Sequence, residues 1–184
     1  RGVGKTTTAR IVAKMLNCTV FDNNKNPLID QCDQAKAIAE DRHPDVLEID
    51  AASNTSVDNA REIIENVKYS PVMGKYKVYI IDEVHMLSKS AFNALLKTLE
   101  EPPEHSKFIF ATTEISKVPI TILSRCQKFD LRRIDNSTMF DFLKKIVDFE
   151  SMEITDKALH MIIKAGDGSV RDNLSILDQA NIFK

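Results

Sequence analysis

Residues 77–83 read Lys-Val-Tyr-Ile-Ile-Asp-Glu, and this stretch decides the fold class of the chain. Its four apolar residues, Val78 to Ile81, leave no polar face, which is typical of a β-strand covered by helices on both sides. The run ends in two carboxylates, Asp82 and Glu83. In an open α/β sheet, ligands bind at the carboxyl ends of the strands. The stretch therefore predicts a central strand of an α/β sheet with a polar site at its end.

Strand-like and helix-like segments alternate around this strand up to residue 132. The expected strands are residues 45–50, 77–82, 107–112 and 127–131. The expected helices in this part are residues 6–16, a short one at 33–40, one opened by a capping box at Thr55–Asp58 and ended before Pro71, and residues 89–101. The helical spacing predicts one buried face on each of the three longer helices. These faces consist of Ala9, Val12, Ala13 and Leu16 in the first helix, Val57, Ala60, Ile64 and Val67 in the helix after the capping box, and Phe92, Leu95, Leu96 and Leu99 in the helix at residues 89–101.

The pattern changes after Arg133, where only helices are expected, at residues 136–149, 155–165 and 169–182. Gly166-Asp167-Gly168 separates the last two of these helices. We therefore predict a doubly wound α/β core at residues 1–132 and a small helical domain at residues 133–184.

Composition argues against several functional classes, although a balanced whole is still compatible with a basic face. Apolar residues make up 43% and charged residues 28% of the 184-residue chain, and the formal net charge is −2. A protein that coats nucleic acid would usually be basic. No apolar run approaches the roughly 18 residues that span a bilayer. Three cysteines, an odd number and widely spaced, argue against a disulfide framework.

The start of the chain carries a candidate phosphate site, with Gly4, Lys5 and Thr6 directly before a predicted helix. A phosphate loop uses glycines so that backbone N–H groups approach phosphate oxygens, and the helix N-terminus adds its positive end. The expected binding residues are Gly2, Val3, Gly4, Lys5, Thr6 and Thr7, with Lys5 on the β- and γ-phosphates and the Thr6 hydroxyl on Mg²⁺. Only the last part of the motif is present, and Gly-Lys-Thr alone is also compatible with an ordinary turn.

The end of the central strand strengthens this interpretation. Asp82 is expected to hold Mg²⁺ through its water shell, and Glu83 to act as the general base toward the attacking water. Thr113, after the strand expected at 107–112, is a candidate for bonding that water or the γ-phosphate. Arg125 is a candidate for stabilising transition-state charge in a neighbouring subunit's site, and Arg171 for reaching the nucleotide from the helical domain. Alone, Thr113 is also compatible with plain β-propensity, Arg125 with an ordinary exposed arginine, and Arg171 with an intrahelical ion pair.

The order of these elements resembles the AAA+ ATPases and, within them, the clamp-loader ATPases. The resemblance is carried by residues 1–7, 16–18, 48–53, 80–87, 92–103, 111–113, 122–126 and 168–172. Ser124-Arg125-Cys126 is a hallmark of clamp loaders. The resemblance implies an AAA+ P-loop core whose first strand is missing from this chain, a helical lid, and an absent C-terminal collar. It also implies an arginine finger acting in trans at Arg125, a sensor-1 position at Thr113 and a sensor-2 position at Arg171.

The function that the resemblance implies is ATP-driven opening of the β sliding clamp and its loading on primed DNA. The implied cofactors are ATP and Mg²⁺. The implied partners are the delta and delta-prime subunits, further copies of the motor subunit, the β clamp and primed DNA, in the bacterial cytoplasm and with no membrane.

The chain departs from the family at the zinc module, which carries four cysteines. Cys18 and Cys32 match two of them, while Ala35 stands where a third is expected. Two thiolates, even with His43 added, cannot close a tetrahedral structural site. We therefore predict that the protein binds no zinc.

Three other interpretations remain. A non-hydrolysing scaffold subunit of the same assembly would be expected to lose the phosphate-loop chemistry, yet Lys5, Thr6, Asp82 and Glu83 are all present. A DExH helicase fits residues 82–85 but needs two nucleotide-binding domains and leaves Ser-Arg-Cys unexplained. Another AAA+ machine, such as a Holliday-junction motor, does not account for Ser-Arg-Cys or for Glu-Glu-Pro-Pro at residues 100–103.

Overall fold

The computed structural model describes residues 2–182, which divide into two compact units. The sheet unit is Thr6–Lys128, and the helical unit consists of residues 2–5 together with 129–182. Arg1, the first residue of the predicted phosphate-loop stretch, and residues 183–184 of the predicted helical domain lie outside the described residues.

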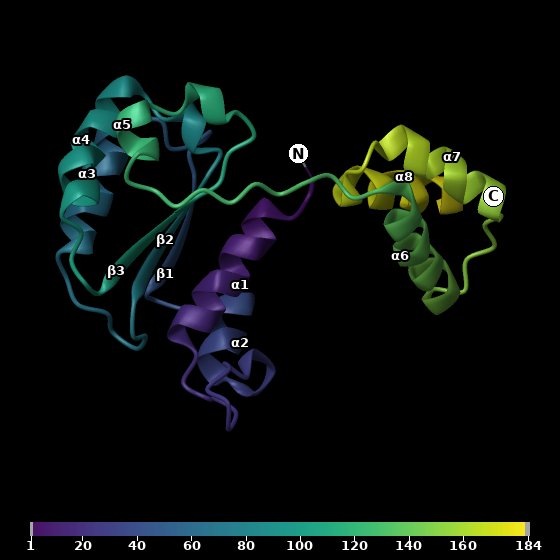
Figure 1. Ribbon diagram of the computed structural model, residues 1–184, viewed down its shortest axis with the longest axis horizontal. Helices are drawn as coiled ribbons and strands as arrows, with labels where there is room; N and C mark the ends of the chain where they lie inside the picture. Colours follow the sequence, from purple (N-terminus) through teal and green to yellow (C-terminus); the bar gives the residue numbers. More distant parts are fainter. Residues whose placement is uncertain (1, 183–184) are drawn as a thin grey trace. The chain divides into compact units, whose positions relative to one another are not determined.

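A three-stranded parallel sheet forms the centre of the sheet unit (Figure 1). Its strands are β1 (Val46–Asp50), β2 (Lys77–Asp82) and β3 (Ser106–Phe110), in the order β1-β2-β3. The predicted central strand at residues 77–82 is confirmed residue for residue. Ile81 stands opposite Ile49 on one side and Phe110 on the other, so the carboxyl ends of the three strands meet at one edge.

Helices cover both faces of the sheet (Figure 1), which confirms the α/β class. One face carries α1 (Lys5–Asn17), and the short helices η1 (Ile29–Gln31) and α2 (Asp33–Ala39) lie beyond it. The other face carries α3 (Val57–Val67), α4 (Lys89–Glu100) and α5 (Ile120–Leu123). Two further 3-10 turns are η2 (Val84–Met86) and η3 (Ile115–Lys117).

The side chains of β2 supply both halves of the core, because successive residues of a strand point to opposite faces. Tyr79 and Ile81 pack in the cluster formed by α3, α4 and α5. Val78 and Ile80 pack against Ala9 and Ala13 of α1. This explains the unbroken apolar run: a strand that is covered on both faces has no polar side.

Three local predictions are wrong. The capping residue of α3 is Ser56, whose hydroxyl accepts from Asn59 N–H (3.2 Å), and not Thr55. Val12 is 39% exposed, because α1 meets β2 through Ala9 and Ala13. No strand forms at residues 127–131. In the described residues, the sheet pairs only β1 with β2 and β2 with β3, and residues 127–131 take no part in it.

The helical unit contains α6 (Asn136–Phe149), α7 (Asp156–Gly166) and α8 (Val170–Ile182), each within one residue of the predicted helix. Its core consists of Met139, Leu143, Val147, Leu159, Ile162, Ile163 and Leu177. Asp167 (φ +45°) and Gly168 (φ +73°) turn the chain between α7 and α8. A Cβ on Gly168 would lie 2.9 Å from the Ile134 carbonyl oxygen, so this turn requires glycine.

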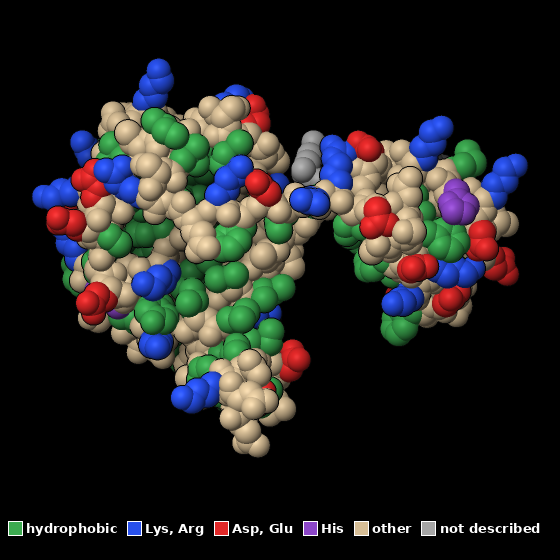
Figure 2. Space-filling view, viewed as in Figure 1, with side chains coloured by type: hydrophobic (Ala, Val, Ile, Leu, Met, Phe, Trp, Pro, Cys, Tyr) green, Lys and Arg blue, Asp and Glu red, His purple; other side chains and the backbone are tan. Residues whose placement is uncertain are grey.

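The surface of both units mixes charges of the two signs on the face that Figure 2 shows. This mixture agrees with the balanced composition and not with a broad basic coat. Among residues 2–182, no helix combines the length and the apolar character needed to cross a bilayer.

Candidate functional site

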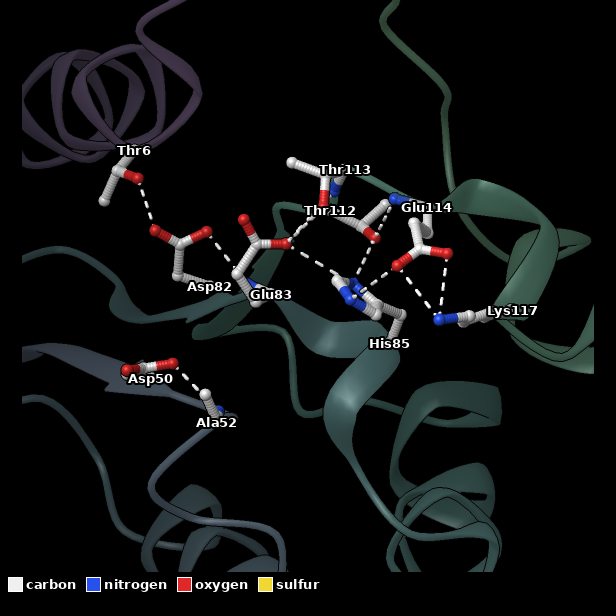
Figure 3. Close-up of polar contacts among 10 residues, drawn as sticks. All are labelled: Thr6, Asp50, Ala52, Asp82, Glu83, His85, Thr112, Thr113, Glu114 and Lys117. Atoms are coloured by element: carbon white, nitrogen blue, oxygen red, sulfur yellow. Dashed lines mark hydrogen bonds and ion pairs between the residues drawn. The ribbon is translucent and has the colours of Figure 1, made fainter. Parts of the chain in front are cut away.

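A threonine–aspartate pair lies at the carboxyl edge of the sheet (Figure 3). Thr6, in the first turn of α1, donates its hydroxyl to Asp82 Oδ2 at 2.5 Å, and Asp82 is the last residue of β2. Asp82 Oδ1 accepts from Glu83 N–H at 2.8 Å. A hydroxyl and a carboxylate oxygen are hard ligands of the kind that Mg²⁺ prefers. The donor set therefore fits a magnesium ion, and the two residues that the sequence assigned to one metal are in contact.

Glu83 follows Asp82 in a left-handed conformation, with φ +46° and ψ +44°. This conformation is uncommon for a residue with a side chain and is often found at functional turns. Glu83 Oε2 accepts from both the N–H (3.1 Å) and the hydroxyl (2.9 Å) of Thr113 (Figure 3). The backbone also joins the two strand ends, since Val84 N–H donates to the Ala111 carbonyl at 3.0 Å. Two predicted site residues, Glu83 and Thr113, are thus brought together.

His85 belongs to the same cluster, although the sequence analysis did not include it among the site residues. Its side chain is only 6% exposed, and Nδ1 lies 3.3 Å from Glu83 Oε2 and 2.9 Å from Thr112 Oγ1. Its Nε2 lies 3.5 Å from Glu114 Oε1. Glu114 also bonds Lys117 (2.9 Å), and this hydrogen bond lowers the pKa of the Glu114 carboxyl below its ordinary value. The signal available in the sequence was the position of His85, two residues after Glu83.

The predicted phosphate-loop residues Gly2, Val3, Gly4 and Lys5 belong to the helical unit, and α1 begins at Lys5. Gly2 (φ +68°) and Gly4 (φ +85°) both adopt the left-handed region that glycine tolerates without strain. Such a backbone allows successive N–H groups to turn toward an anion. Thr7, the last predicted binding residue, is exposed in the first turn of α1.

Gly2 lies against the start of α8 within the helical unit. Its carbonyl accepts from Val170 N–H at 2.9 Å. A Cβ on Gly2 would come within 1.9 Å of Ser169 Oγ and 3.4 Å of Arg171 Cβ. The first glycine of the predicted loop and the predicted sensor-2 arginine are therefore neighbours, and no other residue type fits at position 2 without a shift.

Arg125 makes its contacts away from the Glu83 cluster. Its guanidinium bonds Glu100 Oε1 at 2.5 Å, at the C-terminal end of α4, and the Thr121 carbonyl at 2.6 Å. The Arg125 side chain is one-third exposed. A role of Arg125 in a neighbouring subunit stays a prediction, and Glu100 is a partner that the sequence did not reveal.

Cys18 and Cys32 are both buried in one small cluster with Ala35. Burial opposes ionisation of Cys32, but backbone N–H groups of Thr19 and Ala35 donate to its sulfur and lower its pKa to about 7. Among residues 2–182 there is no group of three or more His, Cys, Asp or Glu side chains arranged to hold a metal. Two thiols are too few for a tetrahedral structural zinc site. This chemistry agrees with the prediction that the protein binds no zinc, which stays a prediction.

The parallel sheet, the glycine-bearing start of α1, the Thr6–Asp82 pair and the helical unit together define a P-loop ATPase core of the AAA+ type with a helical lid. The chain belongs to the family of DNA polymerase III clamp-loader subunits. Residues 1–135 match the family model described as "DNA polymerase III, delta subunit". Residues 139–183 match the model described as "DNA polymerase III clamp loader subunit, ATPase lid domain".

Several curated relatives are close in sequence. The DNA polymerase III subunit tau/gamma of Haemophilus influenzae is 52% identical over 98% of this chain and 26% of that protein. The subunit tau of Bacillus subtilis is 52% identical over 100% of this chain and 32% of that protein. The subunit gamma of Buchnera aphidicola from Acyrthosiphon pisum is 48% identical over 98% of this chain and 49% of that protein. The chain thus spans about a quarter to a half of the length of these relatives.

Solved structures agree on the fold. The RuvB Holliday junction branch migration motor of Thermotoga maritima superposes with a TM-score of 0.58 over 93% of this chain and 56% of that chain, at 17% identity. A gamma-subunit-related protein of the same organism gives a TM-score of 0.50 over 79% of this chain and 50% of that chain, at 24% identity. At these identities the likeness concerns the fold alone.

Proposed function

We propose that this chain is the ATP-binding and ATP-hydrolysing part of a motor subunit of the DNA polymerase III clamp loader. The observation that carries the proposal is the contact between Thr6 and Asp82 at the carboxyl edge of the sheet, with Glu83 directly beside it. Family membership supports the same assignment. The whole protein would use ATP to open the β sliding clamp and place it on primed DNA during replication.

Each site residue has a proposed role. Lys5 and the N–H groups of residues 2–7 bind the phosphates, and Thr6 with Asp82 holds Mg²⁺. When bound, Mg²⁺ neutralises charge on the β- and γ-phosphates. Glu83 acts as general base on the attacking water. Thr113 holds Glu83, and Arg171 is proposed to contact the nucleotide.

Arg125 is proposed to act in trans on the site of an adjacent subunit. In the structure, the Arg125 guanidinium donates one hydrogen bond to the Glu100 carboxylate on the surface of the sheet unit. A phosphate carries more negative charge than this carboxylate and accepts bidentate arginine contacts equally well. Arg125 could therefore exchange Glu100 for a neighbour's γ-phosphate.

The proposed partners are the delta and delta-prime subunits, further gamma/tau copies, the β clamp and primed DNA, within the polymerase holoenzyme. The curated relatives described above are bacterial, which supports a place in the bacterial cytoplasm. We also propose that the ATPase core ends, and the lid begins, near residues 132 and 133.

A second candidate function is a scaffold subunit that does not hydrolyse ATP. The observation in its favour is that the model matching residues 1–135 is described as a delta subunit. The observations against it are the intact Lys5, the Thr6–Asp82 contact and the Glu83–Thr113 contact. A scaffold has no use for a general base held in this way.

The test is ATP hydrolysis by the full-length protein assembled with its clamp-loader partners, with and without β clamp plus primed DNA. Strong stimulation by clamp and primer together is the expected result. Hydrolysis that ignores both would contradict clamp loading but keep the ATPase. No hydrolysis would favour the scaffold, and unwinding of duplex DNA without the clamp would favour a helicase.

A further inference from the structure

His85 occupies a nearly closed position between the ends of β2 and β3. It lies in η2, the 3-10 turn that follows Glu83, and its side chain is 6% exposed. The charged groups near its ring are the Glu83 and Glu114 carboxylates and, through Glu114, Lys117. The imidazole therefore contacts the proposed general base directly, which packing in the core alone does not require.

The two ring nitrogens of His85 face different groups (Figure 3). Nδ1 lies 2.9 Å from Thr112 Oγ1 and 3.3 Å from Glu83 Oε2. Thr112 Oγ1 in turn accepts from the backbone N–H of Glu114 at 3.0 Å. With a proton on Nδ1, the ring donates to Thr112 Oγ1 and places the same N–H beside the Glu83 carboxylate. Nε2 faces Glu114 Oε1 at 3.5 Å, a longer contact to a more exposed carboxylate.

Glu83 is held by one oxygen only. Oε2 receives the N–H and hydroxyl of Thr113 and faces Nδ1 of His85. The left-handed backbone of Glu83 sets the direction in which its side chain leaves the chain, and the contacts of Oε2 set the position of the carboxylate. Two hydrogen-bond donors and the nearby imidazole nitrogen all lie on Oε2, which leaves the other oxygen, Oε1, as the one that can accept a proton.

We propose that His85 is a positioning residue for Glu83: through Nδ1 it holds Oε2, so that Oε1 is the atom that accepts the proton of the attacking water. This inference rests on the proposed ATPase function and names the atom that carries its base step. The water gives its proton to Glu83 Oε1, and its oxygen bonds the γ-phosphorus while the bond to the bridging oxygen breaks. A carboxylate turned away from the water would slow hydrolysis without weakening ATP binding.

The experiment compares two substitutions of similar polarity in the full-length, assembled protein. In His85→Asn the amide nitrogen takes the place of Nδ1, and in His85→Gln the longer side chain carries its amide to the place of Nε2. We expect His85→Gln to lower kcat about tenfold or more with KM for ATP within about twofold, since small misplacements of a base are costly. We expect His85→Asn to stay within about threefold of the wild type, because the donor toward Glu83 is restored. Glu114→Gln, which changes only the partner of Nε2, should stay within about twofold.

Thermal unfolding of each variant separates a folding defect from a positioning defect. Equal kcat values for His85→Asn and His85→Gln, whether both normal or both low, would overturn the inference. The inference would also be overturned if Glu114→Gln lowered kcat as much as His85→Gln does. It would likewise be overturned if His85→Gln raised KM for ATP and left kcat unchanged. If the wild type hydrolyses ATP and the Glu83→Gln variant does not, the proposed function stands, whatever the result for the His85 variants. A wild type without hydrolysis contradicts the proposed function, and the inference with it.

Discussion

Asp45 offers a quantitative test of how the sheet unit is held together. Its carboxylate is fully buried and accepts three backbone N–H groups at 2.7 Å each, from Val72, Met73 and Gly74. Burial raises the pKa of this carboxyl, but the three donors and the nearby His43 outweigh burial, so its pKa lies below the ordinary value. The carboxylate therefore pins the loop that leads into β2, the strand that ends at the functional site.

The substitution Asp45→Asn removes the charge and turns one acceptor into a donor. A hydrogen bond to a charged group is worth about 1.5–3 kcal/mol and a neutral one about 0.5–1.5 kcal/mol, so three bonds lose roughly 3 kcal/mol of charge assistance. The new amide N–H₂ takes the place of either Oδ1 or Oδ2. It then faces the Val72 N–H in the first case, or the N–H groups of Met73 and Gly74 in the second. Relief from burying a charge offsets part of this loss. We expect a net destabilisation of about 2–4 kcal/mol, or a Tm lower by about 10 °C for the unfolding transition of a domain of about 150–250 residues.

The assay is thermal and urea unfolding of the full-length protein, with hydrogen exchange at residues 72–74 as a local readout. Asp22→Asn is the matched control, because Asp22 also accepts two backbone N–H groups (2.8 Å each) but lies in an accessible turn. Its effect should be much smaller. A cost below about 1 kcal/mol for Asp45→Asn, or one equal to that of the control, would refute the reasoning.

The pH dependence has a definite sign. The pKa of Asp45 is lower in the folded protein than in the unfolded chain, whose ordinary value is about 3.9. The stability that this carboxylate contributes is therefore complete above that ordinary value and is lost as the pH falls through the folded pKa. The difference between wild type and Asp45→Asn should shrink in acid, and a difference that stays constant down to acid unfolding would contradict this account.

The remaining predictions concern the functional site and the cysteines. Lys5→Ala should abolish ATP binding or hydrolysis, measured by nucleotide titration and phosphate release; normal clamp loading by this variant would favour the scaffold function. Glu83→Gln should bind ATP but hydrolyse it about 10²-fold or more slowly, and a near-normal rate would remove its role as base. Arg125→Ala should keep ATP binding but reduce hydrolysis at the adjacent subunit's site; in mixed assemblies, variants that silence only their own sites would exclude action in trans. Metal analysis of the purified full-length protein should find no stoichiometric zinc, since Cys18 and Cys32 supply only two thiolates.

The sequence by itself determined the periodic elements. The strand at residues 77–82 and the three helices after residue 133 were predicted to within one residue. Their signals are local, because a fully covered strand needs apolar residues on both faces and a helix needs them every three or four positions. The same local logic identified Thr6, Asp82 and Glu83, since glycines before a helix and acids after a strand mark the chain positions where ligands bind.

Local signals failed where a neighbour distant in the sequence decides the outcome. Residues 127–131 alternate like a strand, but a strand forms only when another strand accepts its hydrogen bonds. Val12 has the spacing of a buried residue, but it is exposed where α1 meets β2 through alanines. Ser56 and not Thr55 caps α3, because the helix starts at Val57. The capping hydroxyl then has to reach the free N–H of Asn59, three residues after Ser56.

Only the tertiary structure decided how the site residues are connected. The parallel register of β2 and β3 sets Ile81 opposite Phe110 and so carries Thr112 and Thr113 to the end of β2. That register brings Thr113 onto Glu83, and Thr112 onto His85, across about thirty positions of sequence. The link between Arg125 and Glu100 likewise depends on how α4 and the segment after α5 pack. Sequence spacing specifies which side chains reach the carboxyl edge of the sheet, whereas strand register and helix packing specify which of their atoms meet.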